Sequence, residues 1–184
     1  MSNMNLPNKL TILRVFLIPV FIIVMKLPIS YGNIIALIVF VVASLTDMLD
    51  GKIARKYNLV TNFGKFMDPL ADKLLVCSAM ICLIDTNQIP SWVVIVIIAR
   101  EFIISGFRLI AVDNGIVIAA SMWGKVKTVC QMGMIIFMLL ISPEIQPFGY
   151  WVFCQIFMYL AMVMTVVSLI DYMVKNKSVL KDTK

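Results

Sequence analysis

Four aspartates lie close together in a sequence that is otherwise strongly apolar. Asp47 and Asp50 are three residues apart, and Asp68 and Asp72 are four residues apart, so each pair shares one helix face. The whole chain has only ten acidic residues, and an ionised carboxylate in lipid is costly unless a cation neutralises it. Converging carboxylates suit Mg²⁺ or Mn²⁺, which prefer oxygen ligands and leave positions for substrate phosphates. The spacing therefore predicts a divalent-metal site.

Two neighbouring helices must bring these pairs together. The first pair falls late in one apolar segment and the second pair falls early in the next. Gly64 and a polar linker between them allow the two helices to run antiparallel. Gly51 directly follows the second aspartate, and the missing side chain lets a phosphate or nucleotide approach closely. The alternative is a structural carboxylate cluster that nearby Lys and Arg side chains neutralise.

Composition places the chain in a membrane. It has 184 residues, of which 61% are hydrophobic and 14% are charged, and its mean hydropathy is +0.98. Ordinary soluble domains are less apolar and more charged. We expect an all-α integral membrane protein, a bundle of six transmembrane helices that forms a single domain over residues 1–174, with a short basic tail at 175–184. Gly, Pro and Asn breakers place the helices at residues 8–26, 32–56, 65–86, 90–112, 123–142 and 148–174.

The basic residues indicate the orientation of this bundle. If both termini are cytoplasmic, all of the 16 Lys and Arg residues except Lys26 fall on the cytoplasmic side. The four aspartates then face the cytoplasm. The net charge of +6 is better explained by topology and anionic head groups than by nucleic acid, so no nucleic-acid partner is expected. Histidine is absent, so proton transfer must fall to carboxylates, Lys or Tyr.

A second polar group lies in the apolar segment 90–112. Glu101, Ser105 and Arg108 follow a spacing of four and three and share one helix face, with Arg100 about 100° away. Arginines this deep in an apolar helix need an anionic partner. For Glu101 we expect an internal salt bridge with Arg108. Lys127, in the following segment, is an equally good candidate for an interfacial anchor or for binding an anion.

The aspartate segment resembles the signature of a known family at every position. The pattern Asp47-x2-Asp50-Gly51-x2-Ala54-Arg55-x8-Gly64-x3-Asp68-x3-Asp72 is similar to that of the CDP-alcohol phosphotransferases. Further segments resemble the bacterial branch that forms phosphatidylglycerophosphate, and the resemblance extends from about residue 5 to residue 174. These segments are Leu6-Pro7-Asn8-x-Leu10-Thr11-x2-Arg14, Gly64-Lys65-x2-Asp68-Pro69-Leu70-Ala71-Asp72-Lys73, Arg100-Glu101-Phe102, Ser105-Gly106-x-Arg108 and Gly124-Lys125-x-Lys127-Thr128.

This resemblance implies an enzyme that transfers the phosphatidyl group of CDP-diacylglycerol to glycerol 3-phosphate, giving phosphatidylglycerophosphate and CMP. It implies two ions, Mg²⁺ or Mn²⁺, held by Asp47, Asp50, Asp68 and Asp72, with Asp72 also the general base. The residues that it implies for CDP-diacylglycerol are Asn8, Lys9, Gly51, Arg55 and Thr61. Those that we expect to bind glycerol 3-phosphate are Arg108, Lys125, Lys127 and Arg100. A homodimer in the plasma membrane, with its site facing the cytoplasm, is also implied.

Other functions remain as alternatives. Within the family, the acceptor is inositol phosphate, serine or phosphatidylglycerol in other members, and a cationic acceptor set argues against free serine. Membrane prenyltransferases also bind a diphosphate through two aspartate motifs, but they have Asn where Thr46 stands here and more spans than 184 residues accommodate. A divalent-cation transporter is the non-enzyme alternative. Carboxylates at helix ends, beside Lys and Arg that repel a permeating cation, argue against it.

Overall fold

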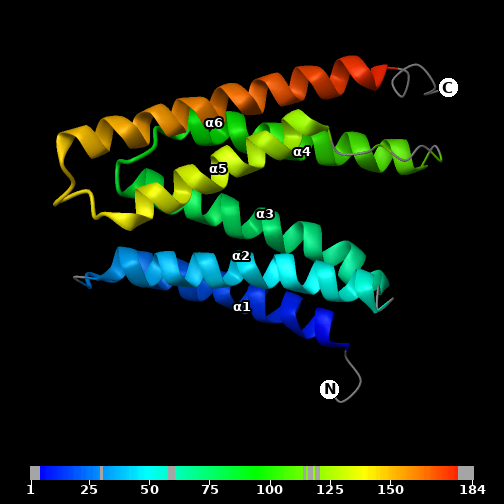
Figure 1. The fold of residues 1–184 in the computed structure, drawn as a ribbon, viewed down its shortest axis with the longest axis horizontal. Coiled ribbons are helices and arrows are strands. Elements are labelled where there is room, and N and C mark those ends of the chain that lie inside the picture. Colours follow the sequence, from blue (N-terminus) through cyan, green and yellow to red (C-terminus); the bar gives the residue numbers. More distant parts are fainter. Residues whose placement is uncertain are drawn as a thin grey trace. The chain divides into compact units, whose positions relative to one another are not determined.

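Six helices make up most of the chain. The computed structural model describes residues 5–29, 31–57, 61–113, 115, 118 and 121–177, without the side chains of 50, 54–56, 62–63, 65–66 and 113. The helices are α1 (Leu6–Lys26), α2 (Gly32–Lys56), α3 (Asn62–Asp85), α4 (Ser91–Asp113), α5 (Met122–Leu140) and α6 (Phe148–Lys175) (Figure 1). Every bound lies within three residues of the expected one, and the described residues contain no strand. The all-α prediction is confirmed.

Local sequence explains where several of these helices begin. Pro7 stands in the first turn of α1, where its missing N–H would have no partner in any case. Thr61 caps α3, because its hydroxyl accepts a 3.0 Å hydrogen bond from the Gly64 N–H. Ser121 does the same before α5, accepting from the Gly124 N–H at 3.1 Å. The two glycines that open α3 and α5 thus follow a hydroxyl cap at the same spacing.

Within the described residues, four of the helices are long and apolar enough to cross a membrane. They are α1, the Gly32–Ile53 part of α2, α5 and α6. The helices α3 and α4 are similar in length, 24 and 23 residues, but they carry more charged side chains. Large apolar side chains such as Phe16, Val129 and Ile156 are exposed by 60% or more, which suits contact with lipid. The structure supports a membrane protein, and the six-span topology stays a prediction.

The first compact unit comprises Met1–Gln88 with Met138–Ile145. In it α1 packs against both α2 and α3, and Figure 1 shows α1 and α2 side by side. The rings of Phe21 on α1 and Phe40 on α2 are fully buried, with centroids 6.1 Å apart. Ala43 on α2 and Ala71 on α3 are also fully buried, and small side chains let helices approach closely. This packing fixes α1 between the two aspartate-bearing helices.

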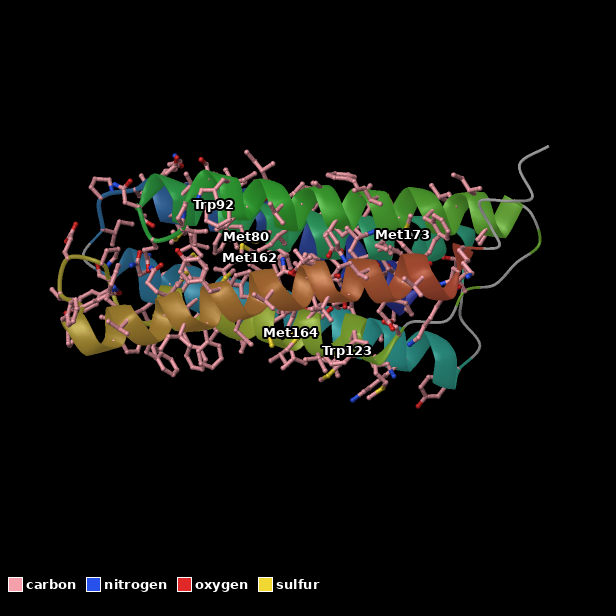
Figure 2. The ribbon with its side chains drawn as sticks, turned by 90° about the horizontal axis from the view of Figure 1, so that it is seen from above. Met80, Trp92, Trp123, Met162, Met164 and Met173 are labelled. Atoms are coloured by element: carbon pink, nitrogen blue, oxygen red, sulfur yellow. The ribbon has the colours of Figure 1, made fainter. Side chains whose placement is uncertain are left out.

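The second compact unit comprises Ile89–Phe137 with Gln146–Lys184, and α4 packs against α6 within it. Ile104, Phe107 and Ala111 of α4 form a buried cluster with Tyr172 of α6, and Met173 packs against that cluster. Figure 2 labels Met173 together with Met162 and Met164, which are spread along α6. Flexible thioether side chains fill irregular gaps between helices, which is the role of Met173 at this cluster.

Helix α5 joins the second unit through aromatic contacts. The ring of Phe137 lies 5.0 Å from that of Phe153 and 4.9 Å from that of Phe157, in edge-to-face geometry. The Tyr150 hydroxyl donates a 2.6 Å hydrogen bond to the Phe137 carbonyl oxygen. These contacts hold the C-terminal half of α5 against the first turns of α6.

Candidate active site

Two of the four aspartates are held by side chains from α1. Arg14 donates from Nη1 to Oδ1 of Asp47 on α2 at 2.5 Å. The Thr11 hydroxyl donates to Oδ1 of Asp68 on α3 at 2.6 Å. Thr11 and Arg14 are three residues apart and therefore share one face of α1. The two carboxylates also interact electrostatically, so α1 brings one acid from each neighbouring helix to the same region.

The other two aspartates are less fully described. Asp72 lies on α3, one turn after Asp68, and is exposed. Asp50 lies on α2 three residues after Asp47, and its side chain is outside the described residues. Among the side chains that are described, no group of three or more His, Cys, Asp or Glu residues converges as a metal site would require. The structure therefore associates Asp47 with Asp68, and the site of four carboxylates stays a prediction.

The donor set of Asp47 and Asp68 suits a hard cation. Among the described residues, the side chains of α1 donate their hydrogen bonds to Oδ1 of each carboxylate. Oδ2 of Asp68 lies on the side of Gly64, 3.4 Å from the position that a Cβ would take there. One oxygen of each carboxylate is thus held by α1, and carboxylate oxygens are ligands of the kind that Mg²⁺ and Mn²⁺ prefer. These residues fit a divalent metal ion.

A polar cluster surrounds the N-terminus of α3. The Thr61 hydroxyl donates to Oδ1 of buried Asn8 at 2.8 Å and accepts from the Gly64 N–H. A Cβ at Gly64 would lie 3.3 Å from Thr61 Oγ1 and 3.4 Å from both Asn8 Oδ1 and Asp68 Oδ2. The contact with Thr61 is tighter than an ordinary van der Waals contact and the other two lie at its lower limit, so a side chain here would shift these polar groups by a few tenths of an ångström. Asn8 and Thr61, both expected to bind the nucleotide, are in direct contact.

The remaining residues expected at the nucleotide are dispersed over α1 and α2. Lys9 is exposed on α1, next to Asn8. Gly51 is half-buried on α2. The side chain of Arg55 is outside the described residues, so its predicted role stays a prediction.

The second unit contains a buried ionic cluster. Arg100 on α4 is buried and donates to Ser168 Oγ at 2.6 Å and to Glu101 Oε1 at 3.1 Å. Lys127 on α5 is buried as well, and its ammonium pairs with the same Glu101 oxygen. The Glu101 carboxylate is thus shared by two cations from two helices. The partly buried Glu101 carboxylate thus pairs with two buried cations.

The expected Glu101–Arg108 salt bridge is wrong. Glu101 pairs instead with Arg100 and Lys127. Arg108 lies seven residues farther along α4, a rise of about 10 Å, whereas Lys127 reaches Glu101 from a neighbouring helix. The Arg108 guanidinium lies 5.8 Å from the centre of the Tyr172 ring, within the range of a cation–π contact.

The four cations expected at the acceptor fall into two groups. Arg108 and Lys125 are exposed, on α4 and α5. Arg100 and Lys127 are buried, and both bind Glu101. The positive charges of Arg108 and Lys125 therefore lie at the surface. Those of Arg100 and Lys127 form ion pairs with Glu101 inside the protein.

Three residues with evident roles in this geometry had no function assigned from sequence. Thr11 and Arg14 stood in a recognised motif, and the signal for Arg14 was a charge inside an apolar helix, which demands a partner. The sequence did not indicate a role for Ser168, because a single serine in an apolar segment is common and does not by itself indicate a function. Predicting its hydrogen bond with Arg100 requires knowledge of how α4 and α6 pack.

Comparison with known proteins connects this geometry with a reaction. The family model described as CDP-alcohol phosphatidyltransferase matches residues 4–167. A protein of Bacillus subtilis (strain 168) is 44% identical over 189 residues, covering 96% of this chain and 97% of its own. One of Haemophilus influenzae is 38% identical, with 97% and 96% covered, and one of Escherichia coli (strain K12) is 44% identical, with 70% and 72% covered. All three are named CDP-diacylglycerol–glycerol-3-phosphate 3-phosphatidyltransferase.

Proposed function

The chain belongs to the CDP-alcohol phosphatidyltransferase family, and from that premise we propose that it transfers the phosphatidyl group of CDP-diacylglycerol to glycerol 3-phosphate. The products are phosphatidylglycerophosphate and CMP. The observation that carries this proposal is the similarity along nearly the whole chain to proteins named for that reaction, at 44% and 38% identity. The carboxylates that α1 holds on α2 and α3 supply the chemistry that such a transfer needs.

Metal binding falls to the aspartates in this proposal. Asp47, Asp50, Asp68 and Asp72 would hold two divalent ions, Mg²⁺ or Mn²⁺. When bound, such ions neutralise the charge of the diphosphate and of the leaving CMP. The support is the pairing of Asp47 and Asp68 with Arg14 and Thr11, which fixes one oxygen of each carboxylate.

Asp72 is the general base of the proposed reaction. It takes the proton from the primary hydroxyl of glycerol 3-phosphate as that oxygen attacks phosphorus in line. Its exposed position on α3, one turn from Asp68, supports access by a small polar acceptor. The chain has no histidine, so a carboxylate is the natural base.

The nucleotide of CDP-diacylglycerol binds beside the first turns of α1 and α3. Asn8 and Thr61 offer polar groups that their mutual hydrogen bond already orients. Gly64 lies close to both of these side chains and to that of Asp68. Gly51 allows a close approach of the diphosphate, while Lys9 and Arg55 supply positive charge. The contact of Thr61 with Asn8 is the support for this assignment.

Glycerol 3-phosphate binds through its phosphate to cations of the second unit. Arg108 and Lys125 are the direct ligands in this proposal, because both are exposed. Lys127 and Arg100 add positive potential from the buried cluster that they form with Glu101. A phosphorylated acceptor suits this set better than free serine does, since serine lacks the dianionic group.

The proposed setting is the plasma membrane. Six spans with both termini in the cytoplasm would place the aspartates on the cytoplasmic side, where CTP-derived lipid and glycerol 3-phosphate are present. The four long apolar helices support membrane insertion, and the topology rests on the distribution of Lys and Arg. The homodimer that the resemblance implies stays a prediction.

Release of CMP by the purified protein tests this function. With CDP-diacylglycerol in mixed micelles, release should require both glycerol 3-phosphate and Mg²⁺ or Mn²⁺, and EDTA should abolish it. CMP release that does not depend on the acceptor would indicate hydrolysis and contradict the transferase. No release from folded protein under these conditions would contradict the proposed reaction altogether.

A further inference from the structure

We propose that Thr11 and Arg14 of α1 are positioning residues for the metal ligands Asp68 and Asp47, so that the docking of α1 sets the affinity of the site for divalent ions. This inference rests on the proposed function, because it takes the two aspartates as metal ligands. It adds a role for α1 beyond nucleotide binding. The relationship is direct, since each of the two α1 side chains contacts one aspartate from a different helix.

Arg14 holds Asp47 with a charge that the protein has fully buried. Its side chain is 0% exposed, whereas that of Asp47 is 37% exposed. A buried cation requires a counter-ion, and the planar guanidinium constrains the orientation of a carboxylate that it binds. Asp47 is therefore anchored through Oδ1 to a buried cation, while its side chain as a whole stays partly exposed. Its orientation is determined before any metal ion arrives.

Thr11 holds Asp68 through a single proton. Its hydroxyl lies 2.6 Å from Asp68 Oδ1 and 3.1 Å from the Pro7 carbonyl oxygen of its own helix. One hydroxyl proton cannot serve both acceptors, and the shorter contact to a carboxylate is the stronger one. The hydrogen bond therefore goes to Asp68, although a threonine in a helix ordinarily bonds its own backbone.

An electrostatic account and an orientation account predict opposite effects on metal affinity when Arg14 is lost. A positive charge at Arg14 repels a nearby metal ion, so its loss would tighten metal binding if charge alone mattered. If orientation of the carboxylates dominates, loss of either contact weakens binding, and the loss of such outer partners typically lowers metal affinity about 10- to 100-fold. Thr11 carries no charge, so its substitution isolates the orientation effect.

The test is direct Mn²⁺ binding to the purified full-length protein in detergent micelles, followed by the electron paramagnetic resonance signal of free Mn²⁺. Thr11→Val keeps the shape of the side chain but removes the hydroxyl, and Thr11→Ser restores a hydroxyl. The matched control is Thr165→Val on α6, because Thr165 is about as buried as Thr11 and its hydroxyl donates to the Ala161 carbonyl oxygen of its own helix. Thermal unfolding of each variant without metal measures the fold independently.

We expect Thr11→Val to weaken Mn²⁺ binding about 10- to 100-fold while Thr11→Ser and Thr165→Val stay close to the parent protein. Arg14→Gln should also weaken binding, and Arg14→Lys should fall between it and the parent. If Arg14→Gln does not fold, Thr11→Val and Arg14→Lys decide the matter.

Two results would overturn the positioning role alone. One is a folded Thr11→Val protein with the parent affinity for Mn²⁺. The other is tighter Mn²⁺ binding by Arg14→Gln, which would make Arg14 a competing cation. A parent protein that binds no Mn²⁺ at all would instead refute the metal site of the proposed function, and the positioning role with it.

Discussion

The guanidinium of Arg100 on α4 donates a 2.6 Å hydrogen bond to the hydroxyl of Ser168 on α6, across 68 residues of sequence. Both side chains are buried. Since Arg100 also binds Glu101, and Glu101 pairs with Lys127 of α5, a single polar cluster connects the three helices of the second unit. A buried ionic cluster of this kind is sensitive to the loss of one member, because the remaining charges lose their counter-ion.

Substitution of Glu101 should therefore destabilise the protein. Glu101→Gln removes the carboxylate that Arg100 and Lys127 share, and the loss of one partner of a buried pair typically costs about 3–5 kcal/mol. Thermal or denaturant unfolding of the purified protein in detergent measures this change. The control is Asp85→Asn, which breaks the exposed Lys26–Asp85 pair and should have a small effect. Equal changes in both variants would contradict the role of the buried cluster.

Arg108 should control the affinity for the acceptor. Arg108→Ala is expected to raise the KM for glycerol 3-phosphate about 10- to 100-fold, because a hydrogen bond to a charged group contributes roughly 1.5–3 kcal/mol. The KM for CDP-diacylglycerol should change little, and Arg108→Lys should retain part of the affinity. Steady-state CMP release at varied acceptor concentration gives both constants. Lys177→Ala, which removes an exposed cation near the C-terminus, serves as the control. An unchanged KM for glycerol 3-phosphate would remove Arg108 from the acceptor site.

Gly64 should tolerate no side chain. Gly64→Ala places a Cβ 3.3–3.4 Å from Thr61, Asn8 and Asp68, so these groups must move apart. We expect at least a tenfold loss of kcat/KM for CDP-diacylglycerol, of the order produced by disturbing the outer partners of a metal ligand, which is about 10- to 100-fold.

The control for Gly64 is Gly149→Ala, near the start of α6, where a Cβ would have no described neighbour within 4 Å beyond the adjoining residues and backbone of its own helix. That variant should keep the parent activity. Activity of Gly64→Ala equal to that of the control would contradict the close convergence at the start of α3.

Asp72→Asn should abolish turnover and retain binding of the nucleotide. The amide cannot accept the acceptor proton, and loss of a general base typically costs about 10²- to 10⁴-fold in rate. Turnover is measured as CMP release, and nucleotide binding as protection of the protein against thermal unfolding by CDP or CMP. Glu144→Gln, which neutralises an exposed acid outside the site, should leave both unchanged. Full activity of Asp72→Asn would exclude Asp72 as the base.

The helices could be predicted from sequence because their ends are marked by strong local signals. Pro7, the hydroxyl caps at Thr61 and Ser121, and Pro147 all stand at helix starts, so the bounds follow from backbone chemistry that is local. The spacing within the pairs Asp47/Asp50 and Asp68/Asp72 likewise predicted acidic faces on two successive helices. What remained hidden was that Thr11 and Arg14 of the first helix contact Asp68 and Asp47.

The missed features depend on which faces of different helices meet. The pairing of Glu101 with Lys127 rather than Arg108 is set by the approach of α5 to α4, and helical spacing within α4 carries no information on it. Likewise, Thr11 is an ordinary helix residue in sequence, and its hydroxyl is directed to Asp68 only because α1 packs against α3. Contacts between side chains of different helices could therefore be identified only from the tertiary structure.

The most direct test of the proposed reaction is a comparison of acceptors. The purified protein would be supplied with CDP-diacylglycerol and Mg²⁺, and with glycerol 3-phosphate, inositol phosphate, serine or phosphatidylglycerol in separate reactions, with the lipid product identified by mass spectrometry. We predict CMP release with glycerol 3-phosphate alone and a product with the mass of phosphatidylglycerophosphate. Turnover with one of the other acceptors and none with glycerol 3-phosphate would contradict the assigned acceptor.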